Sequence, residues 1–211
     1  MIIGIPVYEG VDLLDVTGPY EMFNWMKSSP GVEVEVALVA ETRRPVTSRD
    51  GLTFQPHKSF RGVGQLDVLW VPGGDPTALK RLMTGERRRY LDFLVRQSKA
   101  ARIVASVCEG ALLLAAAGLL DGYRATTHWA FIPCLKQFCN VRVVRGHPRF
   151  VVDRNRLTGG GISSGLDEAL ALIEMLAGAE VAQSVQQTTQ YYPRPPVHSA
   201  LPTAKDCPFS W

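Results

Sequence analysis

The chain has 211 residues, of which 46% are hydrophobic and 20% are charged, and its formal net charge is only +3. A chain of this length can bury a sizeable core within one large α/β domain. The basic residues are scattered apart from Arg87-Arg88-Arg89, which we interpret as part of a solvated helix face, so we expect no nucleic-acid partner. No apolar run approaches the length of a membrane span, and we expect no membrane partner either.

Strand and helix signals alternate along the chain. Apolar, β-branched runs predict strands at 2–8, 32–40, 67–71, 102–107, 141–144, 150–153 and 156–158. Helical periodicity predicts helices at 16–27, with Pro19 in the first turn, and at 86–101, 109–118, 164–176 and 180–190. Residues 43–57 combine turn residues with short β runs, which indicates a side hairpin. The fold class is therefore α/β, a doubly wound, mostly parallel sheet with helices on both faces.

The prolines after residue 190 mark an irregular segment without a core pattern. We predict a single α/β domain over residues 1–196 and an irregular C-terminal tail over 197–211. This tail either drapes over the domain or contributes to an interface.

The first candidate site residue along the chain is Asp15, which lies between the apolar residues Leu14 and Val16. Acidic residues near the start of a helix are favoured by the helix dipole, and that structural explanation applies to each acid of this segment. The apolar neighbours of Asp15 indicate, however, that it does not lie on a freely solvated face. A carboxyl group held there beside a thiol has a raised pKa and can shuttle a proton.

A second candidate is the loop after the strand at 67–71, which carries Gly73 and Gly74. Ligands bind outside the carboxyl ends of strands in doubly wound sheets. Adjacent glycines let a backbone amide turn inward as an oxyanion-type donor. A plain strand-to-helix turn explains the same residues.

The most informative segment runs from the strand at 102–107 through Cys108 and Gly110 into an Ala/Leu-rich helix. A strand that turns sharply into a helix at a lone nucleophile predicts a nucleophile elbow. A side chain at Gly110 would block the close approach of strand and helix. We expect the helix dipole to lower the pKa of the thiol. The alternative is a cysteine buried in the core at the end of a strand.

Two further segments contain polar or glycine-rich patterns after the elbow. His128 pairs with the thiolate if its strand end also lies at the carboxyl edge of the sheet, although a lone histidine is more often structural. Trp129 is expected in a pocket, at an interface or in the core. Gly160, in a run of three glycines, permits tight backbone approach at a pocket rim or within the sheet.

The N-terminal residues and the cysteines indicate the cellular compartment of the protein. The first eight residues lack the charged region and cleavage site of a signal peptide. The four cysteines show no metal-type pairing with histidine. We therefore expect a reducing, cytoplasmic location and no metal site, with Cys134, Cys139 and Cys207 structural or incidental.

In this order the segments resemble the ThiJ/PfpI superfamily, which has a class I glutamine amidotransferase-like fold, and within it the isonitrile hydratase branch. The resemblance spans residues 1–196. It rests on these segments: Leu14-Asp15-Val-Thr-Gly-Pro19, Val71-Pro-Gly-Gly74, Ser106-Val-Cys108, Ala125-Thr-Thr-His-Trp129, Thr158-Gly-Gly-Gly161 and residues 186–196. It implies that Cys108 is the nucleophile and Asp15 its acidic partner. It also implies a homodimer, a small-molecule substrate, and no metal or organic cofactor.

One residue departs from the pattern of the superfamily. The hydratases usually have threonine directly after the cysteine, and the peptidase relatives have histidine, whereas this chain has Glu109. If the Glu109 carboxylate faces the sulfur, it raises the pKa of the thiol and opposes thiolate formation. If it points away, only its backbone amide matters, as half of an anion-stabilising pair with Gly74.

Three functional hypotheses follow. The leading one is an isonitrile hydratase-like lyase in which the Cys108 thiolate attacks the isonitrile carbon and Asp15 is the general acid and base, with Glu109 as a third catalytic residue. The second keeps the thiol but acts on a reactive carbonyl or amide, with His128 as the base. The third is a non-catalytic redox or ligand sensor whose Cys108 is oxidised to sulfinate.

Overall fold

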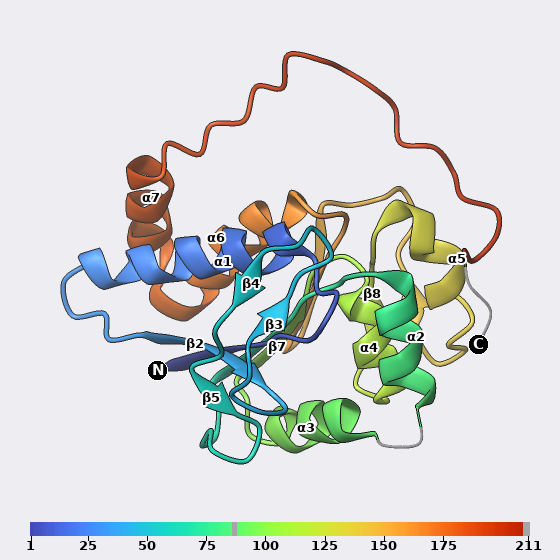
Figure 1. The fold of residues 1–211 in the computed structure, drawn as a ribbon. Helices are drawn as coiled ribbons and strands as arrows, with labels where there is room; N and C mark the ends of the chain where they lie inside the picture. Colours follow the sequence, from blue (N-terminus) through green and yellow to red (C-terminus); the bar gives the residue numbers. More distant parts are fainter. Residues whose placement is uncertain (86–87, 209–211) are drawn as a thin grey trace.

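A seven-stranded sheet forms the centre of the computed structural model, which describes residues 1–85 and 88–208 (Figure 1). The strand order is β10-β11-β7-β6-β1-β2-β5, and all neighbours pair in parallel except β10 and β11. The strands are β1 (Ile2–Pro6), β2 (Glu35–Ala40), β5 (Lys58–Ser59), β6 (Val68–Val71), β7 (Ile103–Ser106), β10 (Phe150–Asp153) and β11 (Arg156–Gly159). The predicted mostly parallel α/β sheet is confirmed.

Helices cover both faces of the sheet (Figure 1). One face is covered by α1 (Leu13–Trp25), α6 (Ser164–Ala177) and α7 (Ala179–Thr188), and the other by α2 (Pro76–Thr84), α3 (Arg89–Ser98) and α4 (Gly110–Ala116). Trp70 of β6 is fully buried and packs edge-to-face on Phe23 of α1. None of the described helices is long and apolar enough to cross a bilayer.

Short elements complete the described chain. The predicted side hairpin is confirmed as the antiparallel pair β3 (Val46–Thr47) and β4 (Thr53–Phe54). Several elements were not predicted from the sequence: η1 (Met26–Ser28), β5, α2, β8 (Arg124–Ala125), η2 (Trp129–Phe131) and α5 (Ile132–Leu135). The strand β9 (Arg142–Val143) pairs with β8 in parallel. Most of these elements are too short for a periodic pattern to emerge.

Two predicted helices begin at the wrong residue. The helix expected from Val16 begins at Leu13, because the Asp12 side chain caps it by accepting a hydrogen bond from the Leu14 amide. Pro19 therefore lies inside α1 rather than in its first turn. The helix expected over 86–101 spans 89–98, and residues 86 and 87 lie outside the described part.

The C-terminal segment is tied back to the domain by a disulfide. After α7 the chain arches over the molecule and returns toward α5, where Cys207 bonds with Cys134 (Figure 1). Cys108 and Cys139 are free. For Cys134 and Cys207, expected to be structural or incidental, the role is therefore structural, and the tail brings together residues 73 positions apart. The cysteine-based argument for a reducing compartment does not hold.

Candidate active site

Cys108 occupies a sharp bend between β7 and α4. Its φ angle is +56°, in the left-handed region that non-glycine residues rarely adopt. The bend is held by the Cys108 amide, which donates to the Gly160 carbonyl at 2.8 Å, and by the Thr127 hydroxyl, which donates to the Cys108 carbonyl at 2.8 Å. A Cβ atom at Gly110 would lie 2.0 Å from the Val71 carbonyl oxygen. The predicted strand–Cys–x–Gly–helix geometry is therefore present.

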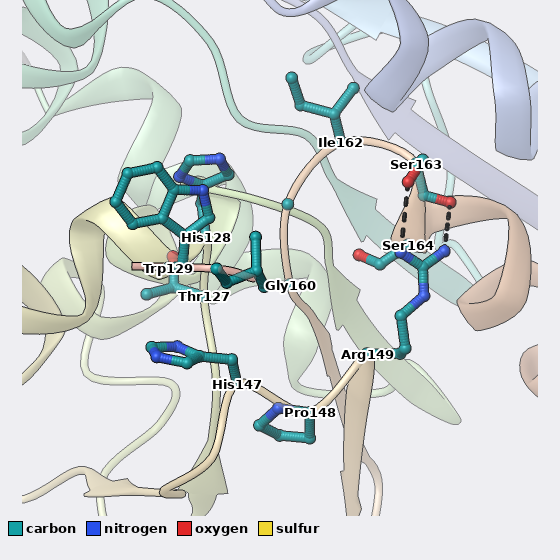
Figure 2. A pocket seen from close by; sticks show the side chains of 12 residues that line it. Thr127, His128, Trp129, His147, Pro148, Arg149, Gly160, Ile162, Ser163 and Ser164 are labelled. Atoms are coloured by element: carbon teal, nitrogen blue, oxygen red, sulfur yellow. Dashed lines mark hydrogen bonds between the residues drawn. The ribbon is translucent and has the colours of Figure 1, made fainter. Parts of the chain in front are cut away.

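A cavity of about 320 Å³ lies beside this bend (Figure 2). His128, Trp129 and Gly160, three of the predicted site residues, line it together with Leu201 of the C-terminal segment. His128 and Trp129 lie on one side of the cavity, opposite Arg149 (Figure 2). Cys108 itself is only 2% exposed and is not part of the lining. The cavity thus borders the bend through Thr127 and Gly160, both of which are hydrogen-bonded to the Cys108 backbone.

Asp15 reaches the thiol from α1 and is completely buried. Its Oδ2 accepts a hydrogen bond from the Gly73 amide at 2.8 Å. Pro19, four residues later, has no N–H to donate to the Asp15 carbonyl, and the Trp70 Nε1–H donates to that carbonyl instead, at 3.1 Å. The orientation of Asp15 is therefore fixed from two neighbouring elements, β6 and the loop that follows it.

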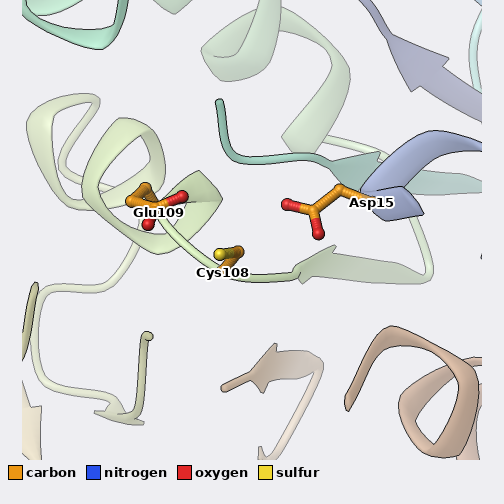
Figure 3. Close-up of side chains that lie close together, drawn as sticks. All are labelled: Asp15, Cys108 and Glu109. Atoms are coloured by element: carbon orange, nitrogen blue, oxygen red, sulfur yellow. The ribbon is translucent and has the colours of Figure 1, made fainter. Parts of the chain in front are cut away.

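Asp15, Cys108 and Glu109 form one buried cluster (Figure 3). One ligand-type atom from each residue lies within 4.8 Å of the other two, and His128 is not a member of this group. A thiol and two carboxyl groups are able to coordinate a metal ion. The backbone N–H groups of Gly73 and Gly74 are directed at the carboxyl groups, however, and such donors favour anions over cations.

Burial raises the pKa of the Cys108 thiol well above 9.0, and the neighbouring Asp15 and Glu109 raise it further. The expected lowering by the helix dipole is therefore wrong in direction, because desolvation and two acidic neighbours outweigh it. The backbone N–H of Ile162 acts in the opposite sense. The resting thiol holds its proton at neutral pH.

The same burial raises the pKa of both carboxyl groups. For Asp15 the next contributions are the charges of Asp12 and Glu109, and the Gly73 amide opposes them. Glu109 is stabilised as an anion by the Cys108 S–H, by its own backbone N–H and by the Gly74 N–H. Glu109 thus faces the sulfur, which decides between the two orientations left open by the sequence.

Gly73 makes room for this cluster. A Cβ atom there would lie 2.5 Å from Glu109 Oε2, 2.7 Å from the Glu109 nitrogen and 3.0 Å from Asp15 Oδ2. The predicted role of the Gly73 amide as an oxyanion donor is not observed, since this N–H donates to Asp15. The Gly74 amide interacts with the Glu109 carboxylate.

Three residues near the site were not among the predicted site residues. Glu168 of α6 is fully buried, Asp15 contributes to its raised pKa, and no hydrogen-bond partner is present for either oxygen in the described part of the chain. Ile162 is a β-branched residue with a φ of +28°. Thr127 holds the Cys108 carbonyl. Only the position of Thr127 beside His128 gave a signal; Glu168 looked like an ordinary polar helix residue.

Proteins of known family resemble this chain in sequence and structure. The profile of the DJ-1/PfpI family matches residues 2–175. An isonitrile hydratase from Pseudomonas putida is 44% identical over 200 residues, covering 95% of this chain and 82% of the hydratase. A crystal structure of a ThiJ/PfpI family protein from Pseudomonas syringae, 34% identical, superposes with a TM-score of 0.83 over 93% of this chain and 77% of that one. The HTH-type transcriptional regulator GbdR of Pseudomonas aeruginosa is 32% identical over 70% of this chain but only 39% of the regulator.

Proposed function

Because this chain belongs to the DJ-1/PfpI family, we propose that it is a cysteine-dependent hydratase of small isonitriles. The reaction adds water to R–N≡C and yields an N-substituted formamide. The identity of 44% with the isonitrile hydratase of Pseudomonas putida supports this substrate class. The observation that carries the proposal is the buried Cys108 thiol held within 4.8 Å of two carboxyl groups, because hydration through a thiol needs both a proton acceptor and a proton donor.

In the first step the Cys108 sulfur attacks the isonitrile carbon. The S–H proton passes to the Glu109 carboxylate, toward which it is directed. The protonated Asp15 gives its proton to the same isonitrile carbon, and its Oδ1 has no other hydrogen-bond partner in the described residues. The product is a thioimidate, R–N=CH–S, covalently bound to the enzyme.

In the second step water adds to the thioimidate carbon. Asp15, now ionised, takes a proton from the water, and Glu109 returns its proton to the imine nitrogen. The C–S bond of the resulting R–NH–CH(OH)–S intermediate then breaks. The hydroxyl proton moves through Glu109 to the leaving sulfur, which releases the formamide and restores the starting protonation state. Covalent catalysis thus divides one difficult addition into two easier ones.

The decisive experiment measures turnover of cyclohexyl isocyanide by wild type, Cys108→Ala and Asp15→Asn. We expect no turnover in Cys108→Ala. Asp15→Asn is expected to lose roughly 100-fold in kcat/KM, which is the usual contribution of a general acid. Substantial turnover by Cys108→Ala would eliminate the mechanism.

The two alternative hypotheses receive less support. A carbonyl or amide enzyme with His128 as base requires this histidine at the thiol, but His128 is not part of the cluster and its Nδ1 accepts a hydrogen bond from Ala130 N–H. A peroxide sensor requires a readily formed thiolate, whereas burial raises the pKa of Cys108. A rapid oxidation of Cys108 ahead of Cys139, with no isonitrile turnover, would favour the sensor.

A further inference from the structure

We propose that Glu109 determines which electrophiles Cys108 can attack, because its own carboxylate fills the site in which the oxyanion of a carbonyl substrate would be bound. The inference deepens the proposed function and rests on it only for the identity of the accepted substrate. Carbonyl substrates would be excluded, and isonitriles would be accepted.

The site in question is an anion cradle, which we define as the backbone N–H groups of Gly74 and Glu109. Two inward-facing amides close to a nucleophile are the usual means of stabilising the oxyanion of a tetrahedral intermediate. The Gly73 amide of the same region already donates to Asp15 Oδ2 at 2.8 Å, and the Ile162 amide interacts with the Cys108 sulfur. Of these four amides, the two of the cradle therefore remain for a substrate oxygen.

The Glu109 carboxylate occupies this cradle. Burial raises the pKa of Glu109, and both amides of the cradle act in the opposite sense by stabilising its charged form. The space above Gly73 shows the same crowding, since a single added carbon would meet Glu109 Oε2 at 2.5 Å and the Glu109 nitrogen at 2.7 Å. Glu109 is only 5% exposed, so the side chain has no solvent-filled space into which it turns easily. Figure 3 shows the glutamate folded back beside the sulfur.

Attack on an ester and attack on an isonitrile differ in whether they need the two amide donors of the cradle. Attack of the thiol on an ester forms an S–C bond while the C=O π electrons move to oxygen, and an oxyanion persists until the alcohol leaves. Attack on an isonitrile places the new proton on carbon, and the later water addition gives a neutral hydroxyl group. A carboxyl group resident in the cradle would leave the first intermediate without these two donors, whereas the second intermediate carries no oxyanion that needs them.

The test uses p-nitrophenyl acetate with wild type, Glu109→Ala and Glu109→Gln. Acetylation of Cys108 releases p-nitrophenolate, the S–H proton is released to the solvent, and the protein gains one acetyl group detectable by mass spectrometry. Glu109→Ala empties the cradle, and we expect its acetylation rate to rise roughly 100-fold, in line with the effect of one oxyanion donor. Glu109→Gln removes the charge but keeps an acceptor oxygen in the cradle, so its rate should stay near that of wild type.

Two controls separate occupancy of the cradle by Glu109 from changes in thiol reactivity and from acetylation at other residues. The alkylation rate with iodoacetamide reports thiol reactivity, which also changes when the Glu109 charge is removed. The Cys108→Ala/Glu109→Ala double variant should show no acetylation. Equal rise in both Glu109 variants, or no rise in a folded Glu109→Ala protein that iodoacetamide still alkylates, would overturn the inference.

The proposed function is judged separately, by isonitrile turnover of the same preparations. A wild type without isonitrile turnover, combined with a gain of acetylation in Glu109→Ala alone, would remove the hydratase proposal and leave the cradle inference standing. Isonitrile turnover in a wild type that already acetylates as fast as Glu109→Ala would do the reverse.

Discussion

Gly73 is the residue at which two carboxyl groups and a backbone amide converge. Replacement by alanine places a methyl group 2.5 Å from Glu109 Oε2, 3.0 Å from Asp15 Oδ2 and 2.7 Å from the Glu109 backbone nitrogen, and a movement of side chains does not relieve the last contact. We expect Gly73→Ala to lower the free energy of unfolding by about 1–3 kcal/mol, as overpacking of a buried site does. Urea denaturation measures this. Gly64→Ala is the matched control, because no atom lies within 4 Å of its added carbon; equal effects would contradict the prediction.

Glu168 predicts a pH dependence of stability. Burial raises its pKa well above the ordinary value of 4.5, and Asp15 adds to this shift. The folded protein therefore binds this proton more tightly than the unfolded chain does. The free energy of unfolding must then fall as the pH rises from about 4.5 through the raised pKa.

Glu168→Gln removes that titration from the folded and the unfolded state alike. We expect the stability of this variant relative to wild type to grow with pH, by at most about 1.4 kcal/mol per pH unit. Urea denaturation at about pH 5 and about pH 8 measures the difference. Glu174→Gln, on the exposed side of the same helix, should keep the wild-type pH dependence. A constant offset for Glu168→Gln would refute the assignment.

The sequence placed Cys108, Asp15 and the glycines correctly at one edge of the sheet but gave the wrong sign for the pKa of the thiol. Strand ends and turn residues are local features, which a single sequence displays. The desolvation of Cys108 is not local, because it depends on how Asp15 and Glu109 pack around it. The helix dipole is one contribution to the pKa of the thiol, and the larger contribution, desolvation, arises from tertiary structure.

At the scale of elements, α1 shows how a helix defect serves the site. Pro19 leaves the Asp15 carbonyl without a helical donor, and Trp70 of β6 supplies the hydrogen bond. Trp70→Phe would leave a buried carbonyl unpaired, at a cost of about 1–3 kcal/mol. In a Pro19→Ala background the backbone N–H that the substitution restores can satisfy this carbonyl.

A double-mutant cycle on Pro19 and Trp70 therefore predicts coupling. We expect the destabilisation caused by Trp70→Phe, measured by urea denaturation, to be smaller in the Pro19→Ala background by about 1 kcal/mol. The lost packing of the indole and of the proline ring enters each single variant and cancels in the cycle. Strict additivity would show that the Trp70 hydrogen bond does not substitute for the missing helical one.

Element prediction from sequence worked where a run was long and apolar, as for β1, β7 and α6. It failed for α2, because the turn at Gly73-Gly74 was read as the feature of interest and the amphipathic residues after Asp75 were left unassigned. It also placed the start of α1 at Val16, after the apolar residues Leu13 and Leu14. The capping Asp12 marks the start three residues earlier than predicted.

At the scale of the whole molecule, the C-terminal segment connects α7 with α5. The chain leaves α7, passes over the body and is bonded at Cys207 to α5, which directly follows the His128–Trp129 segment (Figure 1). On its way Leu201 lines the cavity beside the thiol. This wall of the cavity therefore depends on a bond between residues that no local sequence pattern connects.

We therefore expect that release of the tail changes KM for large substrates more than it changes kcat. Cys207→Ser frees the tail, and loss of the Leu201 contact removes about 1 kcal/mol of apolar burial, so KM for cyclohexyl isocyanide should rise about 5-fold. KM for methyl isocyanide, too small to reach Leu201, and kcat for both should change little. Leu201→Ala with the disulfide intact should reproduce the effect, whereas Cys139→Ser, at a free exposed cysteine, should not.

Labelling with iodoacetamide in denaturant without reductant checks the disulfide independently of activity. Only Cys108 and Cys139 should react, and labelling of all four cysteines would remove the basis of the prediction.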